Sequence, residues 1–185
     1  MVTKIKERKL NRLKNYDYSN SGYYFVTICT DNHIKHFGKI ENDKIVLTDL
    51  GKIVKKCWLD IPIHFPAAIL DQFIIMPNHV HGIIIIDYDD KSQNLVGTNI
   101  QSVGNENIRS LQNNRKTNLS SIIKGFKVGV TKLAKENKFS NFKWQKSFYD
   151  RILRNEKELL NIRKYIKYNP LKEKGEVEFI SNIDF

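Results

Sequence analysis

The sequence predicts one domain in which β-strands and amphipathic helices share a hydrophobic core. Its 185 residues are enough for one such core, and 41% of them are hydrophobic. Short segments rich in β-branched and aromatic residues predict strands, some close enough in the chain to pair as hairpins. Other segments place apolar residues at the spacing of an amphipathic helix. We therefore treat residues 1–185 as a single domain.

The first third of the chain predicts a strand, a hairpin and a helix. Residues 23–30, YYFVTICT, are aromatic and β-branched, as in a strand. Residues 36–47 form an expected hairpin with its turn at Glu41-Asn42-Asp43. Thr48 is the expected N-cap of a helix with one apolar face, and Pro62 is expected to end that helix.

Two histidines lie at the start of the most apolar strand. Residues 68–76 and 79–86 predict two strands joined at Pro77-Asn78, so that His79 and His81 stand near the turn of a hairpin. Side chains at i and i+2 project from the same face of a strand, so both imidazoles can reach one metal ion. The alternative is that neighbouring carbonyl groups or water satisfy the two rings.

The last third predicts two helices with a short strand between them. Asn118 is the expected N-cap of a helix that runs to about Lys135. Residues 144–153 suggest a short strand and turn. Asn155 is the expected N-cap of the final helix, which we expect to end at Pro170.

The final helix places two polar side chains beside its apolar stripe. At about 100° per residue, Tyr165 and Asn169 border the core and form an i, i+4 pair, whereas Tyr168 points to solvent. Tyr165 is a candidate nucleophile and Asn169 a candidate ligand. Each also has a structural alternative, since Tyr165 could be a boundary packing residue and Asn169 a C-cap.

The charge balance favours a polyanionic partner. The formal net charge is +11, which points to nucleic acid first and an acidic membrane surface second. The cations that we expect to contact phosphates lie in a basic N-terminal arm, residues 1–22, and on the helix after Asn118. They are Lys4, Lys6, Arg8, Lys9, Arg12, Lys14, Lys124 and Lys127. A solvated tail and a solubilising helix face are the alternatives.

The sequence predicts no membrane span, no signal segment and no zinc site built from cysteines. No apolar run approaches the roughly 18 residues that a membrane span needs, and no signal-type apolar segment follows the N-terminus. Cys29 and Cys57 lack the paired spacing of a zinc site, so we expect reduced thiols. We expect a cytoplasmic protein. Residues 89–117 are polar and aperiodic, and we expect a long flexible loop there.

Several of these segments together resemble a known family. They are Tyr16-Asp17-Tyr18-Ser19, the strand from Tyr24 to Thr30, Phe37-Gly38, the MPNHVHG block at 76–82, Trp144-Gln145, Arg154-Asn155-Glu156, and Tyr165-Ile166 with Asn169-Pro170. In this order they resemble the REP-associated, single-tyrosine HUH transposases of bacteria, which are IS200-like.

The resemblance implies an α+β, ferredoxin-like fold with helices packed on a central antiparallel sheet. It implies an enzyme that cuts and joins single-stranded DNA containing imperfect-palindrome hairpins, and that acts as a monomer or a homodimer. It matches Tyr165 to the family's nucleophile and His79, His81 and Asn169 to ligands of a divalent ion, Mg²⁺ or Mn²⁺. The polar stretch at 89–117 is longer than we expect for the family. The resemblance therefore does not imply how this chain contacts a DNA hairpin.

Two alternative functions are a binding protein without catalysis and a nucleotide hydrolase. A hairpin-binding protein without catalysis would share the charge and the aromatic strands, whereas both histidines with Tyr165 favour the enzyme. A histidine-triad nucleotide hydrolase would need another histidine two residues after His81. Ile83 occupies that position, which excludes this class.

Overall fold

A four-stranded antiparallel sheet forms the centre of the computed structural model, which describes residues 16–88 and 117–173. Its strands are β1 (Gly22–Cys29), β4 (Ala68–Ile75), β5 (His79–Ile86) and β6 (Tyr149–Leu153), in the order β4-β5-β1-β6. The strands β2 (Gly38–Glu41) and β3 (Lys44–Leu47) form a separate hairpin, whose turn residues Asn42 and Asp43 have positive φ.

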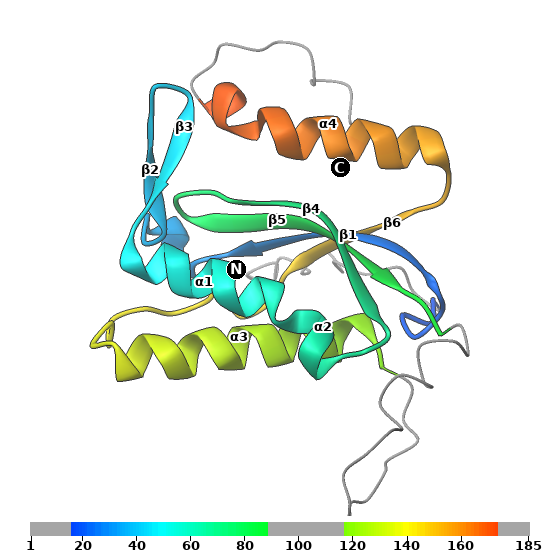
Figure 1. Ribbon diagram of the computed structural model, residues 1–185, viewed down its shortest axis with the longest axis horizontal. Coiled ribbons are helices and arrows are strands. Elements are labelled where there is room, and N and C mark those ends of the chain that lie inside the picture. The colour runs from blue at the N-terminus through cyan, green and yellow to red at the C-terminus, as the bar shows by residue number, and fades with distance from the viewer. Residues whose placement is uncertain (1–15, 89–116, 174–185) are drawn as a thin grey trace, which may run out of the picture.

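Helices cover both faces of the sheet (Figure 1). On one face lie α1 (Asp49–Leu59), the short α2 (Ile61–His64) and α3 (Leu119–Glu136), and on the other lies α4 (Glu156–Glu173). The prediction of an α+β fold with helices packed on a central antiparallel sheet is confirmed. No helix in the described parts of the chain is long and apolar enough to cross a membrane.

The predicted N-caps are confirmed by hydrogen bonds. Thr48 accepts from the Gly51 amide at 3.1 Å, and Asn118 accepts from the Ser121 amide at 2.9 Å. At the start of α4, Asn155 accepts from the Glu158 amide at 2.9 Å. Each of these side chains satisfies a donor of the first helical turn, which has no partner within the helix.

One of the two proline predictions is confirmed and the other is wrong. The helix α1 ends at Leu59, just before Pro62, as predicted, and Pro62 itself lies in the first turn of α2, where the missing N–H costs nothing. Pro170 does not stop α4, which continues to Glu173. A proline near a helix end removes a single backbone hydrogen bond, so the last turn still forms. Asn169 therefore lies within the helix, and the alternative interpretation of Asn169 as a C-cap is wrong.

Alternation along the strands separates two apolar cores. Tyr24, Val26 and Ile28 of β1 face α1 and α3, whereas Phe25 faces α4. The larger core lies under α1 and α3 and centres on the fully buried Trp58. A Cβ on Gly82 would lie 2.3 Å from the indole of Trp58 on α1, so glycine is required where α1 packs on β5.

The described part of the N-terminal arm packs on the protein. Tyr18 is buried and lies 6.0 Å from Tyr24 between ring centroids, so the prediction that residues 16–22 belong to a free arm is wrong. Long-range aromatic packing holds this segment, which its polar local sequence did not indicate. The basic residues from Lys4 to Lys14 and the predicted loop up to residue 116 lie outside the described residues. The loop's two ends meet, because the Tyr88 hydroxyl donates to the Thr117 carbonyl oxygen.

Candidate functional site

His79 and His81 converge on the face of the sheet that α4 covers, as predicted. Their Nε2 atoms lie 3.0 Å apart, at the end of β5 next to the turn. His81 is 4% exposed. The Asn78 carbonyl oxygen in that turn accepts from the Thr30 amide at 2.9 Å, which ties the turn to the end of β1. The backbone therefore holds both imidazoles in a fixed place.

A neighbouring side chain orients each imidazole through Nδ1. His79 Nδ1 lies 2.6 Å from Asn78 Oδ1, and His81 Nδ1 lies 2.8 Å from Thr27 Oγ1. An amide oxygen only accepts, so Nδ1 of His79 bears the proton and its Nε2 presents a lone pair. Burial, with a smaller effect of His33, lowers the pKa of His79 to about 4, so the ring is neutral at pH 7.

Tyr165 projects from α4 onto this histidine pair. Its hydroxyl oxygen lies 3.3 Å from His81 Nε2, and the two ring centroids are 5.2 Å apart. Tyr165 is 8% exposed, whereas Tyr168 is 42% exposed, as the helical period predicted. Phe25 packs edge-on against Tyr165 and stacks on His81, so one apolar ring supports both groups.

Asn169 lies one turn after Tyr165 and is buried with it. Burial raises the pKa of the Tyr165 phenol above its ordinary value of 10.0, and a hydrogen bond with Asn169 lowers it by a smaller amount. Tyr165 is therefore protonated at neutral pH in the protein alone. The hydrogen bond from Asn169 favours the phenolate, and Asn169 is the predicted ligand that shares a helix with Tyr165.

The donor set fits a divalent ion bound together with a phosphate. Two ligands at about 2.1 Å from one ion and about 90° apart are separated by about 3.0 Å, which matches the two Nε2 atoms. Within residues 16–88 and 117–173, no group of three or more His, Cys, Asp or Glu side chains could hold a metal ion. An ion here would thus rest on neutral ligands, His79, His81 and Asn169, and would need anionic oxygens from a substrate.

Comparison with known proteins finds relatives in sequence. No family model matches the chain. An uncharacterized protein of Haemophilus influenzae is 40% identical over 167 residues, which cover 90% of each chain. A candidate REP-associated tyrosine transposase of the same organism is 23% identical over 176 residues, covering 92% of this chain and 82% of that protein.

A solved structure shares the fold. It is a REP-associated tyrosine transposase bound to a REP hairpin, with a TM-score of 0.58 and 18% identity over 90% of this chain and 76% of that one. The chain is thus similar in sequence to a candidate REP-associated tyrosine transposase, and it shares the fold of a solved one. The family resemblance seen in the sequence is confirmed.

The structure places the described lysines predicted to contact DNA on α3, across the sheet from Tyr165. Lys124 is exposed there. Lys127 is half-buried and donates to the carbonyl oxygens of Gln145 and Ser147 at 2.8 and 2.9 Å, and burial lowers its pKa to about 8. The prediction that Lys127 lies on a free outer face is wrong, because its ammonium is used to hold the 145–147 segment.

Sequence reasoning missed other residues of this site. Thr27 and Asn78 orient the histidines, and Lys164 and Lys167 are exposed on either side of Tyr165 in sequence. Asn78 lies inside the MPNHVHG block and could have been suspected. Thr27 could have been found only with the strand register, which places it opposite His81.

Proposed function

We propose that this protein is a metal-dependent enzyme that cuts and rejoins single-stranded DNA through a covalent bond to Tyr165, acting on DNA that contains hairpins. The observation that supports this most is the position of the Tyr165 hydroxyl, 3.3 Å from His81 Nε2 and beside the convergent histidine pair. The related structure described as bound to a REP hairpin supports the choice of hairpin DNA.

Tyr165 would act as the nucleophile in cleavage. Its oxygen attacks phosphorus, an Oη–P bond forms, and the bond from phosphorus to the 3′ oxygen breaks. The 3′ oxygen takes a proton from water to leave as a hydroxyl, and the phenol proton passes to water. The 5′ end stays on Tyr165 as a phosphotyrosine diester. A 3′ hydroxyl can later attack this diester, which restores the phenol and rejoins DNA.

The histidines and Asn169 would hold the ion, which we propose to be Mg²⁺ or Mn²⁺. When bound, it would supply positive charge beside the scissile phosphate and the departing oxygen. Thr27 and Asn78 hold the two imidazoles so that both Nε2 atoms point to one place. Phe25 and the apolar contacts of α4 limit the motion of the phenol, so that attack starts from a defined position.

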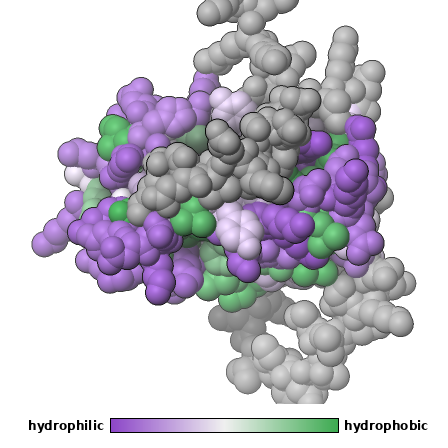
Figure 2. Space-filling view, turned by 90° about the horizontal axis from the view of Figure 1, so that it is seen from above, coloured by the Kyte–Doolittle hydropathy of each residue, from purple (hydrophilic) through white to green (hydrophobic). Residues whose placement is uncertain are grey.

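The surface above α4 suits a polyanion. Figure 2 views the molecule from the α4 side and shows hydrophilic side chains over much of the part not drawn in grey. Three lysines of α4, Lys157, Lys164 and Lys167, are exposed. With a net charge of +11 over the chain, these cations would attract a DNA backbone to the helix that presents Tyr165.

The test is a search for a covalent adduct on single-stranded hairpin DNA in the presence of Mn²⁺. Wild type and Tyr168→Phe should form an adduct that survives denaturation, whereas Tyr165→Phe should bind DNA and form none. Tyr168 is the matched control, since it lies on the same helix but is exposed to solvent. Mass spectrometry should map the nucleotide to Tyr165. Hairpin binding by wild type without any adduct would instead support a binding protein that lacks catalysis.

A further inference from the structure

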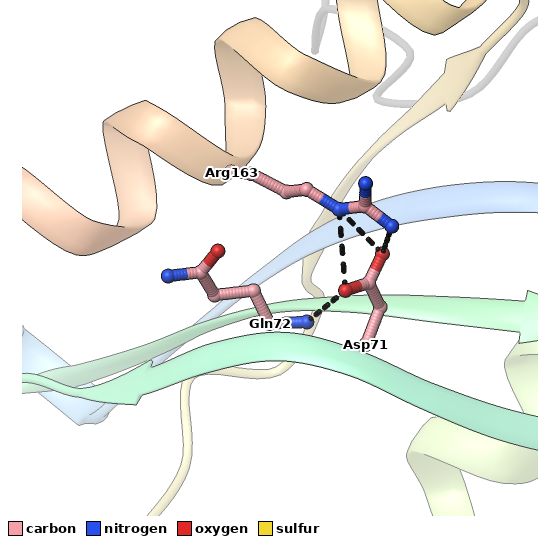
Figure 3. Close-up of polar contacts among 3 residues, drawn as sticks. All are labelled: Asp71, Gln72 and Arg163. Carbon is pink, nitrogen blue, oxygen red and sulfur yellow. Dashed lines mark hydrogen bonds and ion pairs between the residues drawn. The ribbon is translucent and has the colours of Figure 1, made fainter.

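An ion pair joins α4 to the edge strand β4 (Figure 3). Arg163 donates through Nε to Asp71 Oδ1 and Oδ2 at 3.3 and 2.9 Å, and through one terminal nitrogen to Oδ2 at 2.6 Å. The side chain of Asp71 is 17% exposed and that of Arg163 is 38% exposed. A guanidinium that meets a carboxylate with two nitrogens fixes direction as well as distance.

An irregularity in β4 directs Asp71 toward the helix. The register with β5 shifts between Leu70 and Phe73, so that one extra residue is inserted at this point. Asp71 then projects on the α4 side, while Phe73 pairs with Gly82 and stacks on Trp58 below the sheet. The backbone N–H of Gln72 donates to Asp71 Oδ1 at 2.7 Å and holds the carboxylate in place.

Arg163 and Tyr165 lie on opposite flanks of α4. At about 100° per residue, Arg163 is about 100° to one side of Ile162 and Tyr165 is about 60° to the other. Arg163 therefore reaches the edge strand β4, while Tyr165 reaches His81 of β5 and Phe25 of β1. Any rotation of the helix about its own axis must move both side chains together.

A small rotation of α4 would be enough to displace Tyr165. The apolar side chains between α4 and the sheet form the smaller of the two apolar cores: Phe25, Ile83, Leu153, Leu159, Ile162, Tyr165 and Ile166. Because side-chain tips lie about 5–6 Å from the helix axis, a rotation of about 10° moves them by about 1 Å. A displacement of that size in a reacting group can slow a reaction by about 100-fold.

We propose that Asp71 and Arg163 are positioning residues that set the rotation of α4 and thereby the distance from Tyr165 to the histidine pair. This inference rests on the proposed function for its effect on rate, and on the structure alone for its effect on the place of Tyr165. Arg163 need not touch DNA, because its guanidinium is occupied by Asp71.

Adduct formation under single-turnover conditions, at saturating hairpin DNA, tests the effect on rate. Asp71→Asn and Arg163→Met should each slow the reaction by about 30- to 100-fold, with DNA affinity changed less than threefold. Arg163→Lys should restore little, since an ammonium cannot form the fork. The exchange of the two residues, Asp71→Arg with Arg163→Asp, should recover at least a third of the wild-type rate.

The control is Lys56→Met, which removes an ion pair of 2.7 Å between Lys56 of α1 and Asp60 at the C-cap of that helix. It should leave the rate unchanged. If Arg163 contacts DNA instead, Arg163→Met should weaken binding while Asp71→Asn should not, and that result would overturn the proposal. Circular dichroism should show equal folding for every variant compared.

A second measurement needs no reaction. With 3-fluorotyrosine in place of tyrosine, the ¹⁹F resonance lost in Tyr165→Phe reports the surroundings of Tyr165. It should shift and broaden in Asp71→Asn and not in Lys56→Met. An unchanged resonance would refute the positioning role, even if the wild-type protein formed no adduct. A changed resonance without any adduct would refute the proposed function and leave the positioning role standing.

Discussion

Replacement of Gly82 by alanine should destabilise the protein, mainly because the new methyl group would clash with Trp58. The added methyl group would lie 2.3 Å from Trp58 Cζ2, 2.8 Å from Trp58 Cη2 and 3.1 Å from Phe73 Cβ. Trp58 cannot move away easily, because it is fully buried and its ring meets Phe73 at 5.8 Å and Phe126 at 5.3 Å between centroids. Either the indole or β5 must shift.

The cost follows from the closeness of the packing. Overfilling a well-packed core lowers the free energy of unfolding by about 1–3 kcal/mol. Because the indole is rigid and close, we expect Gly82→Ala to cost about 2–3 kcal/mol. With a urea dependence of about 2 kcal/mol per molar, the unfolding midpoint should fall by roughly 1 M. His81 precedes Gly82, so a displaced β5 would also move an imidazole relative to Tyr165.

Urea unfolding of the wild type and four variants tests this account. Gly22→Ala in β1 is the control, since the atom nearest to its new methyl group would be the Tyr24 hydroxyl oxygen, at an ordinary contact distance of 3.7 Å. Trp58→Phe removes the ring atoms that clash, so Trp58→Phe with Gly82→Ala should be more stable than the sum of the single changes by at least about 1 kcal/mol. Strict additivity of the two changes would refute the reasoning.

Three further outcomes are expected. Thr27→Val removes the oxygen at His81 Nδ1 and should weaken Mn²⁺ binding by about 10- to 100-fold in calorimetry, with the midpoint of unfolding nearly unchanged. In EDTA, the stability that neutral His79 contributes is present above pH 6.5 and is lost as pH falls toward 4, about 3 kcal/mol in all; urea unfolding of His79→Gln should show a flatter profile. Hairpin affinity should fall steeply as salt rises from about 50 to 200 mM, and a flat response would exclude the basic surface as the binding surface.

The strands, hairpins and caps were predictable because each depends on a few neighbouring residues. Thr48, Asn118 and Asn155 cap helices by accepting from amides three residues ahead, which is a local property. The shared face of His79 and His81 follows from strand alternation. The burial of Tyr165 beside an exposed Tyr168 follows from the helical period.

Features that depend on distant parts of the chain were not predictable in the same way. Tyr18 looked like part of a polar arm, but it packs on Tyr24. Lys127 looked like a surface cation, but its ammonium meets the carbonyl of Gln145, a segment 18 residues away. The closeness of Thr27 to His81 depends on the pairing of β1 with β5, which no pattern within either strand specifies.

The extra residue in β4 links the two faces of the sheet on which the site depends. Below the sheet it allows Phe73 to stack on Trp58 beside Gly82, and this packing sets the position of β5 and its histidines. Above the sheet it directs Asp71 to Arg163, which holds α4. A regular strand would place Asp71 and Phe73 on the same face, because residues i and i+2 share a side. Either the aromatic stack or the ion pair would then be lost. One local irregularity thus accounts for the placement of both partners in the 3.3 Å contact between Tyr165 and His81.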